Sequence, residues 1–180
     1  MTRGPDRRSW QNPDQILEQT GLGKGMTFVD MGCGDGFFAV PAAKKVGPMG
    51  RVYAVDSDPE AIARLQRTAE REGVKNVLAR VGAGEETVFC DSCADYVFLG
   101  IVLHDFNDPN RVLQNARRML KPTGKLVNLD WKKIHMRFGP PYEIRFNEEK
   151  AVALIRKNSF RIEEVKDSGK YHYLVIAHPS

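Results

Sequence analysis

Three glycines at alternate positions, Gly32, Gly34 and Gly36, are the residues whose spacing suggests chemistry most directly. An apolar run that favours a β-strand, residues 27–31, precedes them, and an apolar segment with helical spacing follows. Glycine has no Cβ, so the backbone can approach a ligand closely, and the N–H groups of the following helix face the same crevice. The pattern predicts a ligand-binding loop between a strand and a helix.

Carboxylates around this loop indicate the charge of the ligand. Asp30 lies near the end of the expected strand and Asp35 lies inside the loop, where a pyrophosphate would meet two like charges in a confined space. A cationic ligand suits these residues better, and S-adenosylmethionine carries an ammonium and a sulfonium but no phosphate. Its ribose would find a partner in Asp56, which ends a second apolar run about 20 residues beyond the last glycine.

Residues 29–36 (VDMGCGDG) and 52–56 (VYAVD) resemble the first two motifs of the class I S-adenosylmethionine-dependent methyltransferases. The resemblance extends from Asn12 to the C-terminus. Within that superfamily the chain is similar to the small-molecule branch, which includes quinone-biosynthesis C-methyltransferases and arsenite methyltransferases. The resemblance implies S-adenosylmethionine as the cofactor, bound by Asp30, Gly32, Cys33, Gly34, Asp35, Gly36, Asp56, Ser57, Ala83 and Gly100.

Ala83 departs from the pattern of that superfamily. After the third expected strand, the usual motif has an acidic residue next to the glycine, and this residue contacts the adenine amino group; here Ala83 follows Gly82. The backbone N–H of Ala83 can still donate to the adenine ring. One side-chain hydrogen bond contributes about 1 kcal/mol, so the departure predicts weaker donor binding rather than none.

Candidate residues for the acceptor follow the fourth and fifth expected strands. His104 and Asp105 are candidate general bases, although His104 could pack beside the adenine and Asp105 could serve a local turn. Trp131, Tyr142 and Arg145 could wall the acceptor pocket, with aromatic rings against a flat substrate and Arg145 paired with a carboxylate or phosphate on it. Equally, Tyr142 and Arg145 could hold a long loop against the domain.

The elements that must position these residues follow an α/β order. The resemblance implies a Rossmann-like, doubly wound, seven-stranded sheet with an antiparallel last strand, flanked by helices, in one domain over residues 1–180. Helices are expected to begin after the capping residues Asn12, Asp58, Asp108 and Asn147. A first strand is expected over the apolar run that Asp30 closes, and further strands at 51–55, 77–81, 94–100, 125–130, 160–166 and 171–177.

Residues 1–11 are polar and basic and are expected to form a flexible lead-in. In similar methyltransferases the leading segment folds over the cofactor. Trp10 could belong to that cover, or it could anchor the segment to the surface of the domain.

Composition limits the other classes of function. The net charge of +4 is scattered in short basic groups, which favours solvated surfaces and a small-molecule acceptor over a nucleic-acid patch. No apolar run reaches the length of a membrane span, and the first residues lack a signal peptide, so the cytoplasm is the expected location.

The three cysteines do not suggest a disulfide framework. Cys90 and Cys93 have the spacing of half a zinc site, but no second pair lies nearby, so structural thiols are favoured and no metal is expected.

Two other functions stay open at this point. The chain could be a methyltransferase that modifies RNA or protein, or a module that binds S-adenosylmethionine without catalysis.

Overall fold

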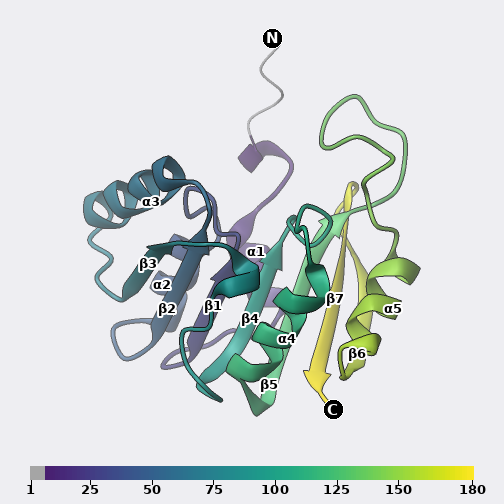
Figure 1. The fold of residues 1–180 in the computed structure, drawn as a ribbon. Coiled ribbons are helices and arrows are strands. Elements are labelled where there is room, and N and C mark those ends of the chain that lie inside the picture. Colours follow the sequence, from purple (N-terminus) through teal and green to yellow (C-terminus); the bar gives the residue numbers. More distant parts are fainter. Residues whose placement is uncertain (1–6) are drawn as a thin grey trace.

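A computed structural model describes residues 7–180, which form one mixed sheet with helices on both faces (Figure 1). The strands are β1 (Thr27–Met31), β2 (Arg51–Asp56), β3 (Val77–Val81), β4 (Ala94–Gly100), β5 (Leu120–Trp131), β6 (Phe160–Ser168) and β7 (His172–Pro179). The α-helices are α1 (Pro13–Gln19), α2 (Ala39–Val46), α3 (Pro59–Arg71), α4 (Pro109–Met119) and α5 (Glu148–Lys157). Two short 3₁₀ helices are η1 (Arg7–Ser9) and η2 (Gly84–Glu86).

The strand order, β3-β2-β1-β4-β5-β7-β6, confirms the predicted doubly wound sheet. Strand β1 pairs in parallel with β2 on one side and β4 on the other, whereas β7 runs antiparallel to both β5 and β6. The order of the chain reverses between β1 and β4. In open α/β sheets ligands bind at such a reversal, outside the carboxyl ends of the strands.

Side-chain caps explain where four of the helices begin. Asn12, Asp58, Asp108 and Asn147 each accept a hydrogen bond from a backbone N–H in the first turn, and the first three are followed by a proline. Helix α2 has no such cap and begins directly from the glycine loop. The predicted starts of these helices are confirmed.

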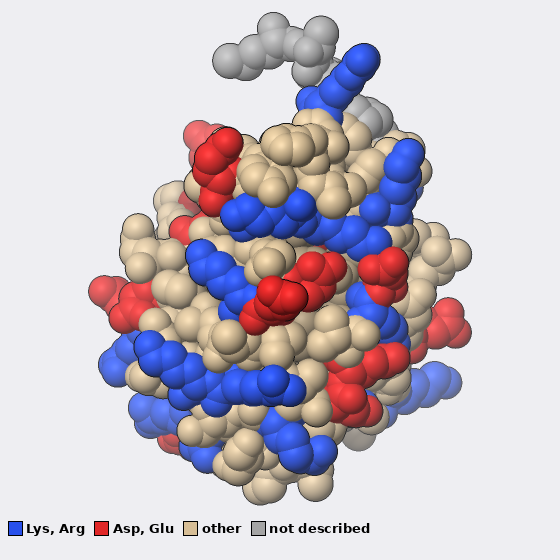
Figure 2. Space-filling view, turned by 90° about the vertical axis from the view of Figure 1, so that its right-hand side faces the viewer, with Lys and Arg blue, Asp and Glu red and all other residues tan. Residues whose placement is uncertain are grey.

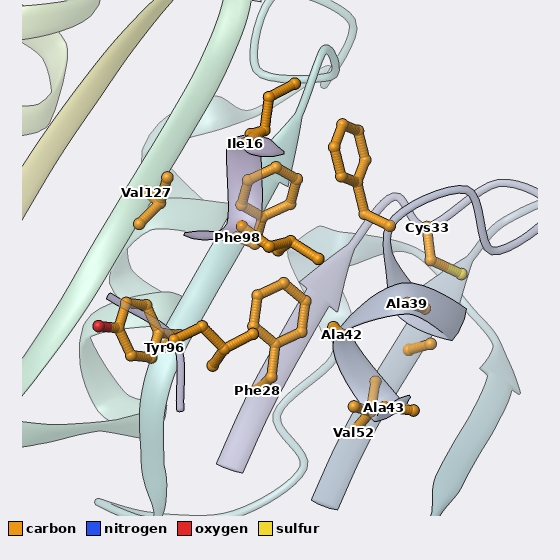
Figure 3. Close-up of a cluster of buried hydrophobic side chains, with 14 of the residues drawn as sticks. Ile16, Phe28, Cys33, Ala39, Ala42, Ala43, Val52, Tyr96, Phe98 and Val127 are labelled. Carbon is orange, nitrogen blue, oxygen red and sulfur yellow. The ribbon is translucent and has the colours of Figure 1, made fainter. Parts of the chain in front are cut away.

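The alternation of side chains along the strands produces one apolar core on each face of the sheet. On the face covered by α1, α2 and α3, the rings of Phe28, Tyr96 and Phe98 lie together (Figure 3). The Tyr96 hydroxyl also donates to the Thr20 carbonyl at 2.9 Å, which ties the end of α1 to β4. This packing fixes the ends of β1 and β4 relative to each other.

Strand β5 begins earlier than the expected range of 125–130. Leu120 already pairs with Ala94, and the register then shifts before Lys125 pairs with Tyr96. The sequence Lys-Pro-Thr-Gly that ends the helix pattern is therefore an irregular part of the strand rather than a free turn. Strands β6 and β7 also extend beyond the expected ranges, because they pair with each other as far as Ser168 and Pro179.

The expectation that Cys90 and Cys93 are structural thiols is wrong. The two residues are joined by a disulfide, with Cα atoms 6.0 Å apart. Ser92 between them has a φ of 49°, in the left-handed region, and this tight turn brings the two side chains together. Cys33 is the free, buried cysteine of the described chain.

The described part of the expected lead-in contains one turn of helix. Residues 7–9 form η1, and Gln11 is buried beside it. The remainder of the predicted lead-in, residues 1–6, lies outside the described residues. Over residues 7–180, the helices are too short or too polar for any of them to traverse a lipid bilayer.

Candidate active site

Two adjoining cavities lie at the carboxyl ends of the central strands. The first, here called the β3-side cavity, has a volume of about 320 Å³ and is lined by Ser57, Ala83, Glu85, Asp105 and Phe106, among others. The second, the β5-side cavity, has a volume of about 350 Å³ and is lined by Asp30, Cys33, Gly34, Phe37 and Trp131, among others. Gly32, Asp56 and Val102 line both, so the two cavities lie side by side, and they are together called the crevice below.

The three loop glycines have different structural roles. Gly32 and Gly36 have φ values of 76° and 89°, and a Cβ on them would lie 2.9 Å from Val102 and 2.8 Å from Leu65. Packing therefore excludes any side chain at both positions. Gly34 also has a positive φ, 54°, but nothing lies within 4 Å of where its Cβ would be. Its open side belongs to the β5-side cavity, so the backbone there is free to approach a ligand.

Asp30 brings a buried carboxyl group to the β5-side cavity. The residue is 1% exposed, and its Oδ2 atom has no hydrogen-bond partner among the described residues. Burial raises the pKa of Asp30 to about 7, against the opposing charge of Arg7 and a backbone hydrogen bond from Ala39. A cationic group in the cavity would satisfy the unpartnered oxygen and favour the ionised carboxylate. This orphaned acceptor fits the ammonium of S-adenosylmethionine.

Asp56 connects the glycine loop to the end of β2. One of its carboxylate oxygens accepts from the Gly34 backbone N–H at 2.8 Å, and the other accepts from the Asp58 N–H at 2.9 Å. These bonds hold the carboxylate at the junction of the two cavities, and each oxygen retains a lone pair for a further donor. A diol such as ribose fits this position.

Ala83 lies on a rigid segment of the β3-side cavity. Its carbonyl accepts from the Thr87 hydroxyl at 2.7 Å. The Asn115 amide donates to the carbonyls of Gly84 and Glu85 at 3.0 and 2.8 Å, which holds η2 against α4. Phe106 packs so closely on Gly84 that a Cβ there would lie 2.9 Å from the ring. The segment therefore offers a fixed, largely apolar wall.

The end of β4 leaves room beside the glycine loop. Gly100 lines the β5-side cavity, and a Cβ at this position would lie 2.6 Å from Phe98. The next residue, Ile101, has a φ of 65°, a conformation uncommon for a branched side chain, and its N–H donates to the Leu129 carbonyl at 2.7 Å. Such backbone strain concentrates at functional sites.

Asp35 and Gly36 are the two predicted cofactor residues that line neither cavity. Both line a separate hollow on the other side of the glycine loop, together with Arg8, Lys44 and Arg71. Ser57 and Ala83 line the β3-side cavity, and Cys33, Gly34 and Gly100 line the β5-side cavity. Burial, the largest cause, raises the pKa of the Cys33 thiol, so this residue is a neutral wall.

His104 forms a buried pair with Asp130 behind the crevice. Its Nδ1 atom lies 2.7 Å from Asp130 Oδ1, and its Nε2 atom lies 3.4 Å from Asp105 Oδ1. The His104 side chain is 1% exposed and lines neither cavity, whereas the Asp105 side chain is 59% exposed and lines the β3-side cavity.

The pKa values of this pair reflect burial and mutual attraction. Burial alone would lower the pKa of His104, but the hydrogen bond and charge of Asp130, with the charge of Asp105, outweigh it and raise the pKa. Burial also raises the pKa of Asp130, against the effect of His104. The pair therefore holds a proton more tightly than a free imidazole would.

The three predicted acceptor residues are not brought together in one cavity. Trp131 lines the β5-side cavity, whereas Tyr142 and Arg145 line a separate hollow inside the loop of residues 134–145. The Arg145 guanidinium donates to the carbonyls of Ile134 at 2.9 Å, Phe138 at 3.1 Å and Pro140 at 2.6 Å. Arg145 therefore stabilises the conformation of its own loop.

Three further residues shape the β5-side cavity. Trp10 lines it, stacks on His172 with ring centroids 5.4 Å apart, and lies tilted against Trp131 with ring centroids 5.2 Å apart. Arg7 lines it from the same segment. His172 is 2% exposed, and burial lowers its pKa to about 4, so its ring is neutral beneath the two indoles. No local pattern marks His172 or Arg7, because their roles depend on contacts between distant segments.

A family model described as a methyltransferase domain matches residues 22–176. The fold is also that of a solved S-adenosylmethionine-dependent methyltransferase from Aquifex aeolicus, with 30% identity, a TM-score of 0.92 and 98% and 94% of the two chains covered. The chain belongs to the S-adenosylmethionine-dependent methyltransferases. The fold and family expected from the glycine loop are confirmed. The [4+2]-cyclase SpnF shares the fold at 16% identity and a TM-score of 0.80.

Curated relatives of this methyltransferase-family chain include demethylmenaquinone methyltransferases. The enzyme from Geobacillus kaustophilus is 29% identical over 124 residues, which cover 69% of this chain and 53% of the relative. The enzyme from Staphylococcus aureus is 32% identical over 117 residues, which cover 64% of this chain and 47% of the relative. The chain thus spans about half the length of the curated relatives it matches.

Proposed function

We propose that the protein transfers a methyl group from S-adenosylmethionine to a small, flat acceptor molecule. The observation that carries this proposal is the unpartnered, buried Oδ2 atom of Asp30, which lies beside the open backbone of Gly34 in a cavity that continues past Asp56. An acid for an ammonium and an acid for a ribose thus lie at opposite sides of one glycine loop.

The proposed donor site uses both cavities. Asp30 binds the ammonium from the β5-side cavity, and Asp56 binds the ribose hydroxyls at the junction. Ser57 and the backbone of Ala83 bind the adenine in the β3-side cavity. Gly32, Cys33 and Gly100 line the crevice without filling it, and Gly36 lets the loop pack against Leu65. Asp35 adds negative potential from the far side of the loop.

The bound donor supplies an electrophilic methyl group on a sulfonium sulfur. What this chain contributes is position and desolvation, because an in-line displacement gains most from holding the two partners together away from water. Trp131 and Trp10 wall the β5-side cavity with flat apolar surfaces that suit a planar acceptor. Arg145 and Tyr142 keep the 134–145 loop in the shape that backs Trp131.

An acceptor that loses a proton needs a base near the crevice. We assign this role to His104 and Asp105, since the Asp105 carboxylate faces the β3-side cavity and lies 3.4 Å from His104 Nε2. Asp130 holds His104 Nδ1 and thereby orients the ring.

A small molecule suits this molecule better than RNA or protein. On the face formed by α5, β6 and the 134–145 loop, basic and acidic side chains lie next to one another rather than in separate patches (Figure 2). The relatives named demethylmenaquinone methyltransferases indicate a quinone-like acceptor as the first class to try. The reaction is proposed to occur in the cytoplasm, which fractionation of source cells would test.

Incubation with methyl-labelled S-adenosylmethionine and an extract of source cells tests this proposal. Label in the small-molecule fraction, strongly reduced in a control with Asp30→Asn protein at the same donor concentration, is the expected result. Label only in acid-precipitable material would instead identify an enzyme that modifies RNA or protein. Donor binding without any transfer of label would identify a binding module.

A further inference from the structure

Arg7 reaches the donor crevice from a segment that precedes the matched methyltransferase domain. Residues 7–9 form η1, and the Gln11 N–H donates to the Arg7 carbonyl at 2.9 Å. The Arg7 Nε atom donates to the Gln11 side-chain oxygen at 2.6 Å, and Gln11 is 3% exposed. The guanidinium is therefore held in place by a buried neighbour rather than free to move in solvent.

The Arg7 guanidinium lies at the wall of the β5-side cavity, where it can contact a bound ligand. It lies 4.0 Å from the centroid of the Phe37 ring, and both residues line the β5-side cavity. Burial lowers the pKa of Arg7, while the charges of Asp35 and Asp30 oppose this effect. Arginine remains protonated at neutral pH under such conditions. A fixed cation thus lines the same cavity as the carboxyl group that is proposed to bind the ammonium, within range of its charge.

The charges that line the crevice are unbalanced. Asp30, Asp56, Glu85 and Asp105 contribute four carboxyl groups, and Arg7 is the only Lys or Arg among the described residues that line either cavity. Two other basic groups nearby do not replace it. His172 is neutral because burial lowers its pKa to about 4, and the Arg145 guanidinium is occupied by the carbonyls of its own loop.

The amino-acid part of the donor presents a carboxylate next to its ammonium. A carboxylate in a crevice lined with acids would be repelled unless a cation were close to it. We propose that Arg7 binds this carboxylate, so that Arg7 and Asp30 together recognise the zwitterionic end of S-adenosylmethionine. This inference rests on the proposed function and adds to it a binding residue from outside the glycine-loop motif.

Trp10 gives the contact a structural consequence. It follows Arg7 on the same turn, its N–H donates to the Arg7 carbonyl at 3.3 Å, and its ring packs against Trp131 with centroids 5.2 Å apart. Binding of the carboxylate by Arg7 therefore stabilises the segment that places Trp10 over the acceptor side of the cavity. Donor binding and formation of the acceptor wall are coupled through η1.

Calorimetric binding of three ligands tests the proposal: S-adenosylmethionine, its decarboxylated analogue, and methylthioadenosine, which lacks the whole amino acid. Arg7→Gln is expected to weaken binding of S-adenosylmethionine by about tenfold, the scale of a charge-assisted hydrogen bond, and to leave the other two affinities unchanged. Arg7→Lys should retain an intermediate affinity, since it keeps the charge and loses the planar fork. Arg8→Gln, which changes the neighbouring cation, should leave all three unchanged.

Each other outcome overturns the assignment. Equal weakening of all three ligands by Arg7→Gln would show that Arg7 only packs the segment. Unchanged donor affinity together with a raised KM for a carboxylated acceptor would assign Arg7 to the acceptor instead. If the wild-type protein bound no S-adenosylmethionine, the proposed function would fail as well, whereas donor binding insensitive to Arg7→Gln would contradict this inference alone.

Discussion

The two halves of the crevice are built in different ways. The donor half depends on short, contiguous pieces of chain: the glycine loop of residues 32–36, the end of β2 at Asp56, and the segment after β3 at Ala83. Its walls are fixed by hydrogen bonds between these pieces, such as that from the Gly34 backbone N–H to the Asp56 carboxylate. Changes there should alter donor affinity and leave the rest of the protein intact.

The acceptor half is assembled from segments far apart in the sequence. Trp10, Trp131, Phe138 and His172 meet through ring contacts with centroids 4.3 to 5.9 Å apart. Its polar groups are buried, and the His104–Asp130 pair lies behind the cavity rather than in it. The difference suggests that the donor half is specified by local motif and the acceptor half by tertiary packing, which leaves the acceptor half freer to vary.

The largest effect is expected where the acceptor half relies on buried charge. His104→Gln removes the partner of Asp130, whose side chain is 0% exposed, and should lower the free energy of unfolding by about 3 kcal/mol. Donor affinity should change little, because His104 lines neither cavity. Urea denaturation and donor calorimetry on the same samples measure both. An unchanged free energy of unfolding would contradict the conclusion that His104 and Asp130 form a stabilising buried pair.

Asp30→Asn should have the largest effect on the donor half. It removes the charge that attracts the ammonium while it keeps the shape of the side chain, and the loss should be about 2 kcal/mol, or about thirtyfold in Kd. Asp35→Asn serves as the matched control on the far side of the loop, with a smaller loss expected. Similar losses in both variants would indicate a general field effect rather than a contact at Asp30.

Asp56→Ala is expected to cost more than about 1 kcal/mol in donor binding, because it removes both the ribose acceptor and the bond that holds the Gly34 N–H. Ser57→Ala, one residue along the same cavity wall, should have a smaller effect. Isothermal titration with S-adenosylmethionine separates the two. An unchanged affinity for Asp56→Ala would remove Asp56 from the donor site.

Trp10→Ala should have the smallest effect of these variants, and the effect should fall on acceptor binding. Loss of the ring opens one side of the β5-side cavity and should raise the acceptor KM several-fold, with donor Kd changed less. Steady-state kinetics with the acceptor found by the labelling experiment measure this. A loss of donor affinity without a change in acceptor KM would place Trp10 in the donor half.

The same contrast explains which features the sequence could predict. Strands β3 and β4 have the predicted bounds, because their apolar runs are bounded by turn residues, and the capped helix starts are confirmed for the same local reason. The strand before the glycine loop and the helix after it are both predicted from the glycine spacing and the apolar residues around it. The family is confirmed, while the roles of Asp30 and Asp56 stay predictions.

Long-range contacts account for what the sequence did not reveal. The start of β5 depends on Leu120 pairing across the sheet with Ala94. The Cys90–Cys93 disulfide depends on the backbone turn at Ser92. Asp130 sits at the end of an expected strand, but only the fold brings it within 2.7 Å of His104.

The measurement that most directly tests the account is the pH dependence of S-adenosylmethionine affinity. Burial raises the pKa of Asp30 to about 7 in the free protein, and the ammonium requires the ionised carboxylate. Affinity should therefore be greatest between about pH 7 and pH 8, where the carboxylate is ionised and the α-ammonium still holds its proton, and fall by up to about tenfold for each pH unit below 7. Asp30→Asn should bind weakly with no such dependence. A wild-type affinity that stays flat from pH 8 to pH 5.5 would contradict the assignment of Asp30 as the ammonium-binding residue.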